Sequence, residues 1–224
     1  MTGQGTPSAS PPGLGDLVRL YLTEKIQICE VFPVEVVVAA AQQLFRTYVL
    51  GGTIYGMANG GNSGTLDHCY VDFRHHPFVD DTKSRAVPDT VPRCTFVNLA
   101  GSPAELTGAV NDLGVEDMFA AGLRGRVTER DFVMAYSGSG NSANVLAGLK
   151  LAAACGARTF AMTKGNGGQC RELADICLIV PGTSAFPGQT GANDNNFHFE
   201  DFMLAFNHML VGLLRQYVSA VVAL

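Results

Sequence analysis

The chain has 224 residues, which is within the usual size of one folded domain and is enough to bury a substantial core. Its net charge is −5 and no basic patch is visible, so nucleic acid and anionic membranes are poor candidate partners. No apolar run reaches the roughly 18 residues of a transmembrane helix. Only 16% of the residues are charged, which predicts that other subunits cover part of the surface.

The first 14 residues are rich in Gly, Ser, Thr and Pro and lack the basic and apolar parts of a signal peptide. We therefore expect a flexible arm or a linker remnant, followed by a single domain over residues 15–224. The six cysteines form no CxxC pair, and several lie in apolar segments. This pattern predicts reduced, mostly buried thiols in a cytoplasmic protein rather than a cysteine-rich metal site.

Strands and helices are predicted to alternate along the rest of the chain. Periodicity and turn residues predict helices at 15–31, 33–49, from about 63, at 103–110, at 115–123, after 143 and at 198–221, strands at 53–58, 94–99, 131–137, 158–163 and 175–181, and a polar surface connection at 76–93. Such alternation is typical of a parallel sheet covered on both faces. We expect an α/β fold with three layers, a doubly wound sheet of five parallel strands, N-terminal helices and a long C-terminal helix.

Two Gly-rich loops, ANGGNSG at 58–64 and SGSGNSA at 137–143, each follow a predicted strand and open a helix. Ligands of such folds bind at the carboxyl ends of the strands, where helix starts offer unpaired N–H groups. The second loop adds three hydroxyl donors and contains no lysine or arginine, which predicts a neutral phosphate cradle. Neither loop carries GxxxxGK[ST] or GxGxxG, so no nucleotide cofactor is expected. The alternative is that both loops are ordinary helix caps.

The segment SGSGNSANVLAGLKLAAACGARTFAMTKGNGGQCRELADICLIVP, at 137–181, resembles the sugar isomerase (SIS) domain family, and within it the phosphoheptose isomerases. In those proteins a STSGNSAN loop binds the sugar phosphate. NGG at 59–61, VNDLGVEDMF at 110–119 and HFEDFMLAFNHMLVGLL at 198–214 match further family segments. The resemblance covers roughly residues 15–220.

This resemblance implies the aldose–ketose isomerisation of a long-chain sugar phosphate through an enediol. The substrate would be sedoheptulose 7-phosphate or an eight-carbon octulose phosphate of an antibiotic sugar pathway. The family also implies a homotetramer with active sites between subunits.

The resemblance assigns four positions to catalysis and metal binding. His68 falls on the metal-ligand histidine, Asp72 on the catalytic glutamate, Glu200 on a ligand glutamine and His208 on the catalytic histidine. Asp72 is one methylene shorter than the family residue, and Glu200 is charged where the family has an amide. Two histidines and two carboxylates suit Zn²⁺, which is the expected cofactor. Which carboxylate is the base stays open.

The expected substrate-binding residues come from both loops and from two helices. They are Asn59, Gly60, Gly61, Asn62, Ser63, Asp112, Ser137, Ser139, Ser142 and Glu200. Asn62 replaces the family serine after NGG, and Phe197 stands where the family has an acidic residue. These two changes put the identity of the substrate in doubt rather than the binding of its phosphate.

Helical spacing constrains how the four assigned residues can meet. His68 and Asp72 are four residues apart and share one face of a helix. Glu200 and His208 are eight residues apart, or roughly 12 Å along a helix axis. Unless both side chains lean inward, one of them must come from another subunit.

Other interpretations stay open. A non-catalytic SIS module could bind a phosphosugar or a protein partner, and another SIS enzyme could act as a lyase or on a pentose phosphate. Taken singly, His208 could be a buried hydrogen-bonded histidine, His68 with Asp72 a surface pair, and Glu200 a helix-start acid. Asp112 could be a capping residue, and we interpret His75 and His76 as loop residues.

Overall fold

The computed structural model describes residues 12–80, 82 and 87–222, so most of the predicted N-terminal arm lies outside the described residues. The elements are α1 Leu14–Glu30, α2 Val34–Val49, β1 Thr53–Ala58, α3 Gly61–His75, η1 His76–Phe78, β2 Thr95–Asn98, α4 Pro103–Leu113, η2 Val115–Asp117, α5 Met118–Leu123, β3 Phe132–Tyr136, α6 Ala143–Ala154, β4 Arg158–Lys164, α7 Cys170–Leu173, β5 Ile176–Val180, η3 Gly191–Asn193 and α8 Asn196–Val222.

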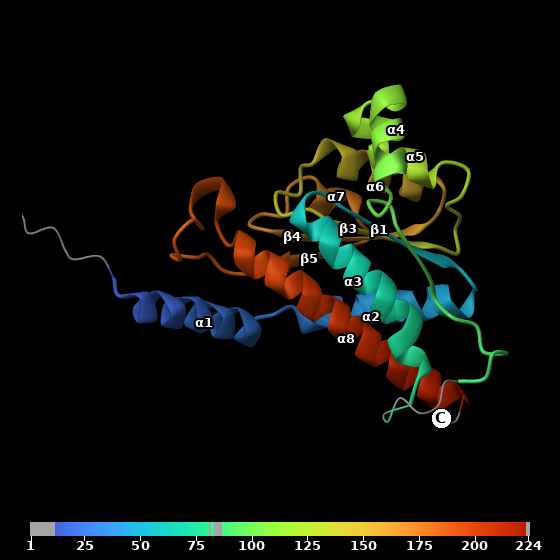
Figure 1. Cartoon of the computed structure of the whole chain (residues 1–224), viewed down its shortest axis with the longest axis horizontal. Helices are drawn as coiled ribbons and strands as arrows, with labels where there is room; N and C mark the ends of the chain where they lie inside the picture. The colour runs from blue at the N-terminus through green and yellow to red at the C-terminus, as the bar shows by residue number, and fades with distance from the viewer. Residues whose placement is uncertain (1–11, 81, 83–86, 223–224) are drawn as a thin grey trace, which may run out of the picture.

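The five strands form one parallel sheet in the order β2-β1-β3-β4-β5. Figure 1 shows this sheet between the long helix α8 and the helices α5, α6 and α7. The central β1 and β3 pair in register from Ile54 with Phe132 to Ala58 with Tyr136. The carboxyl ends of both strands, and the loops that follow them, therefore lie side by side. The sequence predicted only that both Gly-rich loops lie at the carboxyl ends of strands, and the strand order adds that they are neighbours.

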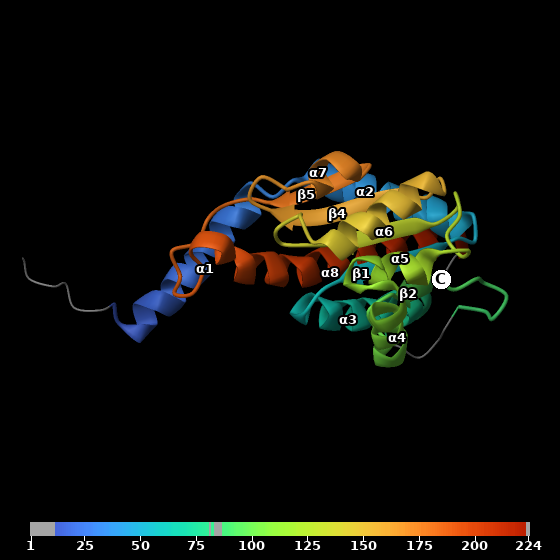
Figure 2. The same cartoon turned by 90° about the horizontal axis from the view of Figure 1, so that it is seen from above.

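Helices cover both faces of the sheet, which confirms the predicted three-layer doubly wound fold. One apolar core packs α2, α3 and α8 against one face, with Leu44, Phe73 and Phe206 fully buried. The other core packs α5, α6 and α7 against the opposite face around Met57 and Phe119. Both alternating faces of the strands are apolar because neither face meets water. Helix α1 extends away from this body (Figure 2).

Several predicted boundaries differ from the observed ones. Helix α3 begins at Gly61 rather than near Ser63, and residues 103–113 form one helix instead of 103–110. The predicted helix 115–123 splits into a 3-10 turn and α5, and the short α7 was not predicted. The connection at 76–93 is partly internal, since Pro77, Phe78 and Val87 are buried. The polar residues and prolines of this segment indicate a surface loop, so the sequence pattern did not predict its buried side chains.

Among the described residues, no single helix combines the length and apolar character needed to cross a bilayer. Helices α1 and α2 meet that test only as a pair, which is bent by 70°.

Candidate functional site

The two Gly-rich loops and the start of α8 enclose a pocket of about 240 Å³ at the carboxyl edge of the sheet. Because it contains the predicted phosphate loop, we call it the phosphate-type pocket. Its lining residues are Asn59, Asn62, Tyr136, Ser137, Gly138, Ser139, Ser142, Lys164, Ala192 and Asn196. Five of the residues expected from sequence to bind substrate therefore share one pocket, with hydroxyl and amide groups at the start of α6.

Hydrogen bonds and close packing fix the shape of the second loop. The Ser137 and Ser142 Oγ atoms are 3.1 Å apart, and the Asn141 backbone N–H donates to Ser139 Oγ at 3.2 Å. Gly140 has a φ of +64°, and a Cβ there would lie 2.0 Å from the carbonyl oxygen of Gly167. Only glycine fits this position, because both the backbone conformation and the approach of the next loop exclude a side chain. The serines are thus held in a pre-formed cradle.

Lys164, the last residue of β4, also lines this pocket and was missed by sequence reasoning. Its Nζ donates to the Ala192 carbonyl oxygen at 3.1 Å. The predicted cradle was neutral, but the pocket also contains a lysine, which comes from the end of the neighbouring strand. Its place at the carboxyl end of a predicted parallel strand was the signal that could have identified it.

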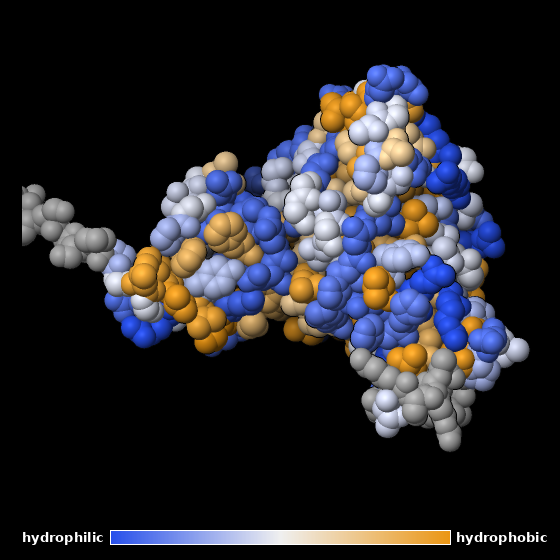
Figure 3. Space-filling model, in the orientation of Figure 1, coloured by the Kyte–Doolittle hydropathy of each residue, from blue (hydrophilic) through white to orange (hydrophobic). Residues whose placement is uncertain are grey.

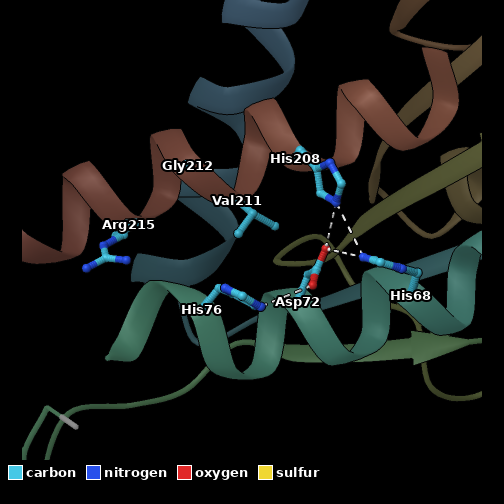
Figure 4. A pocket seen from close by; sticks show the side chains of 7 residues that line it. All are labelled: His68, Asp72, His76, His208, Val211, Gly212 and Arg215. Atoms are coloured by element: carbon cyan, nitrogen blue, oxygen red, sulfur yellow. Dashed lines mark hydrogen bonds and ion pairs between the residues drawn. The ribbon is translucent and has the colours of Figure 1, made fainter. Parts of the chain in front are cut away.

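A second group of polar side chains lies between α3 and α8 (Figure 4). The Nε2 atom of His68 is 3.1 Å from Oδ2 of Asp72 and 3.3 Å from Nε2 of His208, and His208 Nε2 is 3.5 Å from the same Asp72 oxygen. Residues 140 positions apart in sequence thus form a compact triangle. It opens into a pocket of about 330 Å³, which His76, Val211, Gly212 and Arg215 also line.

Burial differs sharply within this triangle. The Asp72 side chain is only 7% exposed, whereas those of His68 and His208 are 49% and 54% exposed. A buried carboxylate needs hydrogen-bond donors or a cation beside it to remain charged. Two imidazoles at the rim, each able to act as donor or ligand, supply such partners while remaining accessible to a molecule in the pocket.

The triangle also fits a divalent ion. Bonds of 2.0–2.1 Å in a tetrahedral zinc site correspond to ligand–ligand separations of about 3.3 Å, and the three edges here are 3.1, 3.3 and 3.5 Å. All three ligand atoms lie within 4.8 Å of one another. Three protein ligands with one open side are the arrangement of catalytic rather than structural zinc sites.

Glu200, the fourth residue expected in the metal set, lies elsewhere within the chain. It is half-buried in the first turns of α8, and its Oε1 accepts from Asn196 Nδ2 at 2.9 Å. Because α8 is one continuous helix, Glu200 lies roughly 12 Å along the axis from His208. One chain therefore gathers three of the four residues, and Glu200 lies beside the phosphate-type pocket instead.

The remaining expected residues are placed apart from the pocket linings. Ser63 Oγ donates to the Gly60 carbonyl oxygen at 2.7 Å, so that hydroxyl closes the turn before α3. Gly60 and Gly61 shape the same turn. Asp112 is exposed on α4, accepts from Asn111 Nδ2 at 2.8 Å and lines neither described pocket.

Two residues beside Asp72 were missed or misread from the sequence. His76 is not a simple loop residue, since its Nε2 lies 3.5 Å from Asp72 Oδ1 and it lines the pocket. Asn207 is buried and donates from Nδ2 to Asp72 Oδ2 at 2.9 Å. The spacing of His68, Asp72 and His76 at four-residue intervals could have indicated His76, but Asn207 became identifiable only when α8 was placed.

A buried clasp holds the segment before α8, which supplies Ala192 to the phosphate-type pocket. Glu24 on α1 accepts hydrogen bonds from Ser184 Oγ and the Ala185 N–H, both at 2.7 Å, and lies 3.0 Å from His198 Nε2. Burial by itself would raise the pKa of Glu24, but the hydrogen bonds outweigh it and lower that pKa below its ordinary value. The carboxylate is therefore stabilised in its charged form.

Helix α1 is also tied to α8 by a half-buried carboxylate. Asp201 accepts from Tyr21 Oη at 2.6 Å and from Lys25 Nζ at 2.8 Å. Burial opposes ionisation of Asp201, yet these two donors lower its pKa on balance. Together with the Glu24 clasp, these bonds fix the first turns of α8 and hence the adjoining pocket.

Comparison with known proteins gives a consistent result, although no protein-family model matches the chain. A phosphoheptose isomerase of Chlorobaculum tepidum is 28% identical over 184 residues, which cover 81% of this chain and 78% of the relative. A phosphoheptose isomerase of Mycobacterium tuberculosis is 30% identical over 143 residues, covering 64% of this chain and 68% of the relative. The solved phosphoheptose isomerase of Neisseria gonorrhoeae shares the fold, with a TM-score of 0.75, 21% identity and coverage of 91% of this chain and 100% of that chain.

Proposed function

The chain belongs to the phosphoheptose isomerase family and is thus a sugar phosphate isomerase, and on this premise we propose that it interconverts the ketose and aldose forms of a long-chain sugar phosphate. Sedoheptulose 7-phosphate is the proposed substrate, with an eight-carbon octulose phosphate as the alternative. One observation carries this proposal. The ligand atoms of His68, Asp72 and His208 are as far apart as three ligands of one metal ion.

The phosphate of the substrate would bind at the second loop. Ser137, Ser139 and Ser142 would donate hydroxyl hydrogen bonds, and the start of α6 would add backbone N–H groups and the positive end of a helix dipole. Lys164 would supply a counter-charge from the edge of the pocket. Three kinds of donor around one 240 Å³ space suit a dianion better than a neutral group.

The separation of the two pockets supports a long substrate. From Asn62, which lines the phosphate-type pocket, to His68 is six residues of α3, or roughly 9 Å. The phosphorus of an extended seven-carbon sugar phosphate lies roughly 10 Å from C1, given bonds of about 1.5 Å. The carbonyl end would then reach the triangle, while Glu200, beside the phosphate, would face hydroxyls nearer the middle of the chain. This geometry favours Asp72 over Glu200 as the base.

Isomerisation requires one proton to move between neighbouring carbons. Asp72 would take the proton from the carbon beside the carbonyl, which leaves an enediol, and would return it to the adjacent carbon. His208 and His68, at the rim of the pocket, would face the two substrate oxygens whose protonation must change. A divalent ion held by the three side chains, for which we propose Zn²⁺, would supply Lewis-acid stabilisation of the negative charge that develops on those oxygens.

Nε2 of His208 can serve as proton donor or as metal ligand, but a neutral imidazole cannot do both at once with the same atom. In the metal-loaded enzyme His208 would therefore act as a ligand. In the metal-free enzyme the His208 imidazole would instead be the acid that protonates the substrate oxygen. Comparing turnover of the metal-free and metal-loaded enzyme separates these roles.

We further propose a homotetramer with active sites between subunits. Helix α1 extends from the body with Leu14, Val18, Leu22 and Ile26 exposed at four-residue intervals, between 54% and 84% each. Figure 3 displays apolar residues gathered over this end of the molecule. An uncovered apolar stripe of this length is typical of an interface. The open side of the triangle would leave room for a residue from a second copy.

The test is a panel of ketose phosphates with five to eight carbons, assayed before and after metal removal. We expect turnover to be highest for the seven- or eight-carbon compounds, to fall on treatment with a chelator and to return with Zn²⁺. Equal turnover with and without bound metal would eliminate the ion from the proposal. A preference for five-carbon compounds would contradict the proposed substrate length.

A further inference from the structure

The two carboxylate oxygens of Asp72 have different neighbours. Oδ2 faces Asn207 Nδ2 at 2.9 Å together with the imidazoles of His68 and His208. Oδ1 faces His76 Nε2 at 3.5 Å (Figure 4). Besides the two histidines of the triangle, the carboxylate thus has two further neighbours, Asn207 from α8 and His76 from the turn after α3.

The side-chain amide of Asn207 is oriented so that its Nδ2 group donates a hydrogen bond to Asp72. Turning its amide would place Oδ1 against a carboxylate oxygen, so Nδ2 must face Asp72. Within the described residues, Asn207 Oδ1 is then buried without a hydrogen-bond partner. A buried unpaired carbonyl lowers stability, and an apolar side chain of similar size would avoid that cost. The structural benefit of asparagine here is its bond to Asp72.

His76 reaches Asp72 because the backbone continues as a helix past the end of α3. Its φ and ψ are −59° and −40°, and it lies four residues after Asp72. Side chains of a helix lean toward its N-terminus, which directs the imidazole over the Asp72 carboxylate. The side chain is 49% exposed in the same pocket.

Once His68 and His208 turn their Nε2 lone pairs toward an ion, neither can donate to Asp72 through that nitrogen. Asn207 and His76 then remain, among the described side chains, as the donors beside its carboxylate. Outer partners of this kind fix the orientation of a metal-binding side chain and commonly change metal affinity 10- to 100-fold.

We propose that Asn207 and His76 are positioning residues that clamp Asp72, so that Oδ2 rather than Oδ1 completes the triangle with the two imidazoles. Asn207 fixes Oδ2 from α8, and His76 fixes Oδ1 from the helical turn after α3. This inference rests on the metal centre of the proposed function and deepens it. Neither residue contacts the substrate in this account, because each acts through Asp72.

The test measures Zn²⁺ affinity of the full chain by competition with a chromophoric chelator. N207L and H76F should each weaken binding about 10- to 100-fold, and H76Q, which keeps an N–H donor, should recover most of the loss. H75F is the matched control, since His75 is exposed beside His76 and lines neither described pocket. In turnover, kcat should fall in both variants with little change in KM, because the phosphate pocket is untouched.

A double-mutant cycle with D72A decides whether the two residues act through Asp72. In the D72A background, N207L and H76F should cause no further loss of Zn²⁺ affinity. Equal losses with and without Asp72, or unchanged affinity in the single variants, would overturn the clamp and leave the metal centre standing. Wild-type affinity no greater than that of a H68A/H208A variant would overturn the metal centre and the clamp together. If N207L does not fold, the H76F cycle at the half-exposed position carries the test.

Discussion

At the scale of single residues, the proposed mechanism depends on one carboxylate that is almost fully buried. Asp72 is 7% exposed and is surrounded by an amide and three imidazoles. Each neighbour is a hydrogen-bond donor or a metal ligand, and none is an acid. These neighbours satisfy the buried carboxylate oxygens with hydrogen bonds or ion pairs, which a buried carboxylate needs.

Lys164 gives a prediction about phosphate binding that is separate from the chemistry at Asp72. K164Q should raise KM for the sugar phosphate roughly 10-fold or more, because a hydrogen bond to a charged group contributes about 1.5–3 kcal/mol. The change in kcat should be small. K150Q, at an exposed position on α6, is the control. Competitive inhibition by inorganic phosphate should weaken in parallel, and an unchanged inhibition constant would remove Lys164 from the phosphate site.

Sequence reasoning placed correctly those residues whose proximity depends on local spacing. His68 and Asp72 share a helix face by their separation alone, and the serines of the second loop are marked by their place after a strand. Asn207 was not identified, because its neighbour Asp72 is 135 residues away and only the packing of α8 on α3 joins them. Lys164 and His76 lie at the ends of elements, where boundaries are predicted least reliably.

At the scale of secondary-structure elements, α1 holds the segment before α8 from one side, and Lys164 at the end of β4 bonds it from the sheet. Glu24 is the centre of the attachment to α1, and its charge is favoured by donors from Ser184, Ala185 and His198. The same segment brings Ala192 and Asn196 to the phosphate-type pocket. Loosening α1 should therefore affect both stability and substrate binding.

The Glu24 clasp predicts a pH-dependent contribution to stability. Because its pKa is lower in the folded protein than in the unfolded chain, the contribution is present above the ordinary glutamate value of about 4.3 and disappears as the pH falls through the folded value. E24Q should be less stable than wild type at neutral pH, and the gap should narrow in acid. E30Q, exposed on the same helix, is the control. Urea unfolding at several pH values measures this, and a gap that widens in acid would contradict it.

The elements themselves were largely predictable because each strand is a short apolar run and the first two helices have a clear apolar period. The exceptions share a physical cause. Residues 76–93 carry prolines and charges that indicate a loop, yet Phe78 and Val87 enter the core through single side chains. Single buried side chains in a loop form no repeating pattern, so periodicity does not detect them.

At the scale of the whole molecule, a doubly wound sheet brings two loops together at one edge and sets α3 beside α8. The phosphate-type pocket follows from the first arrangement and the metal-type triangle from the second. The strand order that pairs β1 with β3 was not predicted, because no pattern in the chain indicates which strands are neighbours. The apolar stripe on α1 is exposed at this scale as well, and neither core of the described residues covers it.

The exposed stripe on α1 predicts self-association. Light scattering should give about 95 kDa for the wild-type protein, four times the chain mass of 23.7 kDa. L22D with I26D should reduce that mass and lower activity, because charge would be buried at the interface. L113D, at an exposed position on α4, should leave the mass unchanged. A wild-type mass near 24 kDa in fully active enzyme would contradict the tetramer.

The central claim is that the phosphate pocket and the triangle of His68, Asp72 and His208 together isomerise a long-chain sugar phosphate. The most direct measurement follows sedoheptulose 7-phosphate by NMR in deuterated water with Zn²⁺ supplied, for wild type and H208Q. The account predicts formation of the aldose with deuterium entering beside the carbonyl, and a loss of several powers of ten in turnover for H208Q while inorganic phosphate still binds. No conversion of any five- to eight-carbon ketose phosphate by the wild-type enzyme, or equal turnover by H208Q, would contradict it.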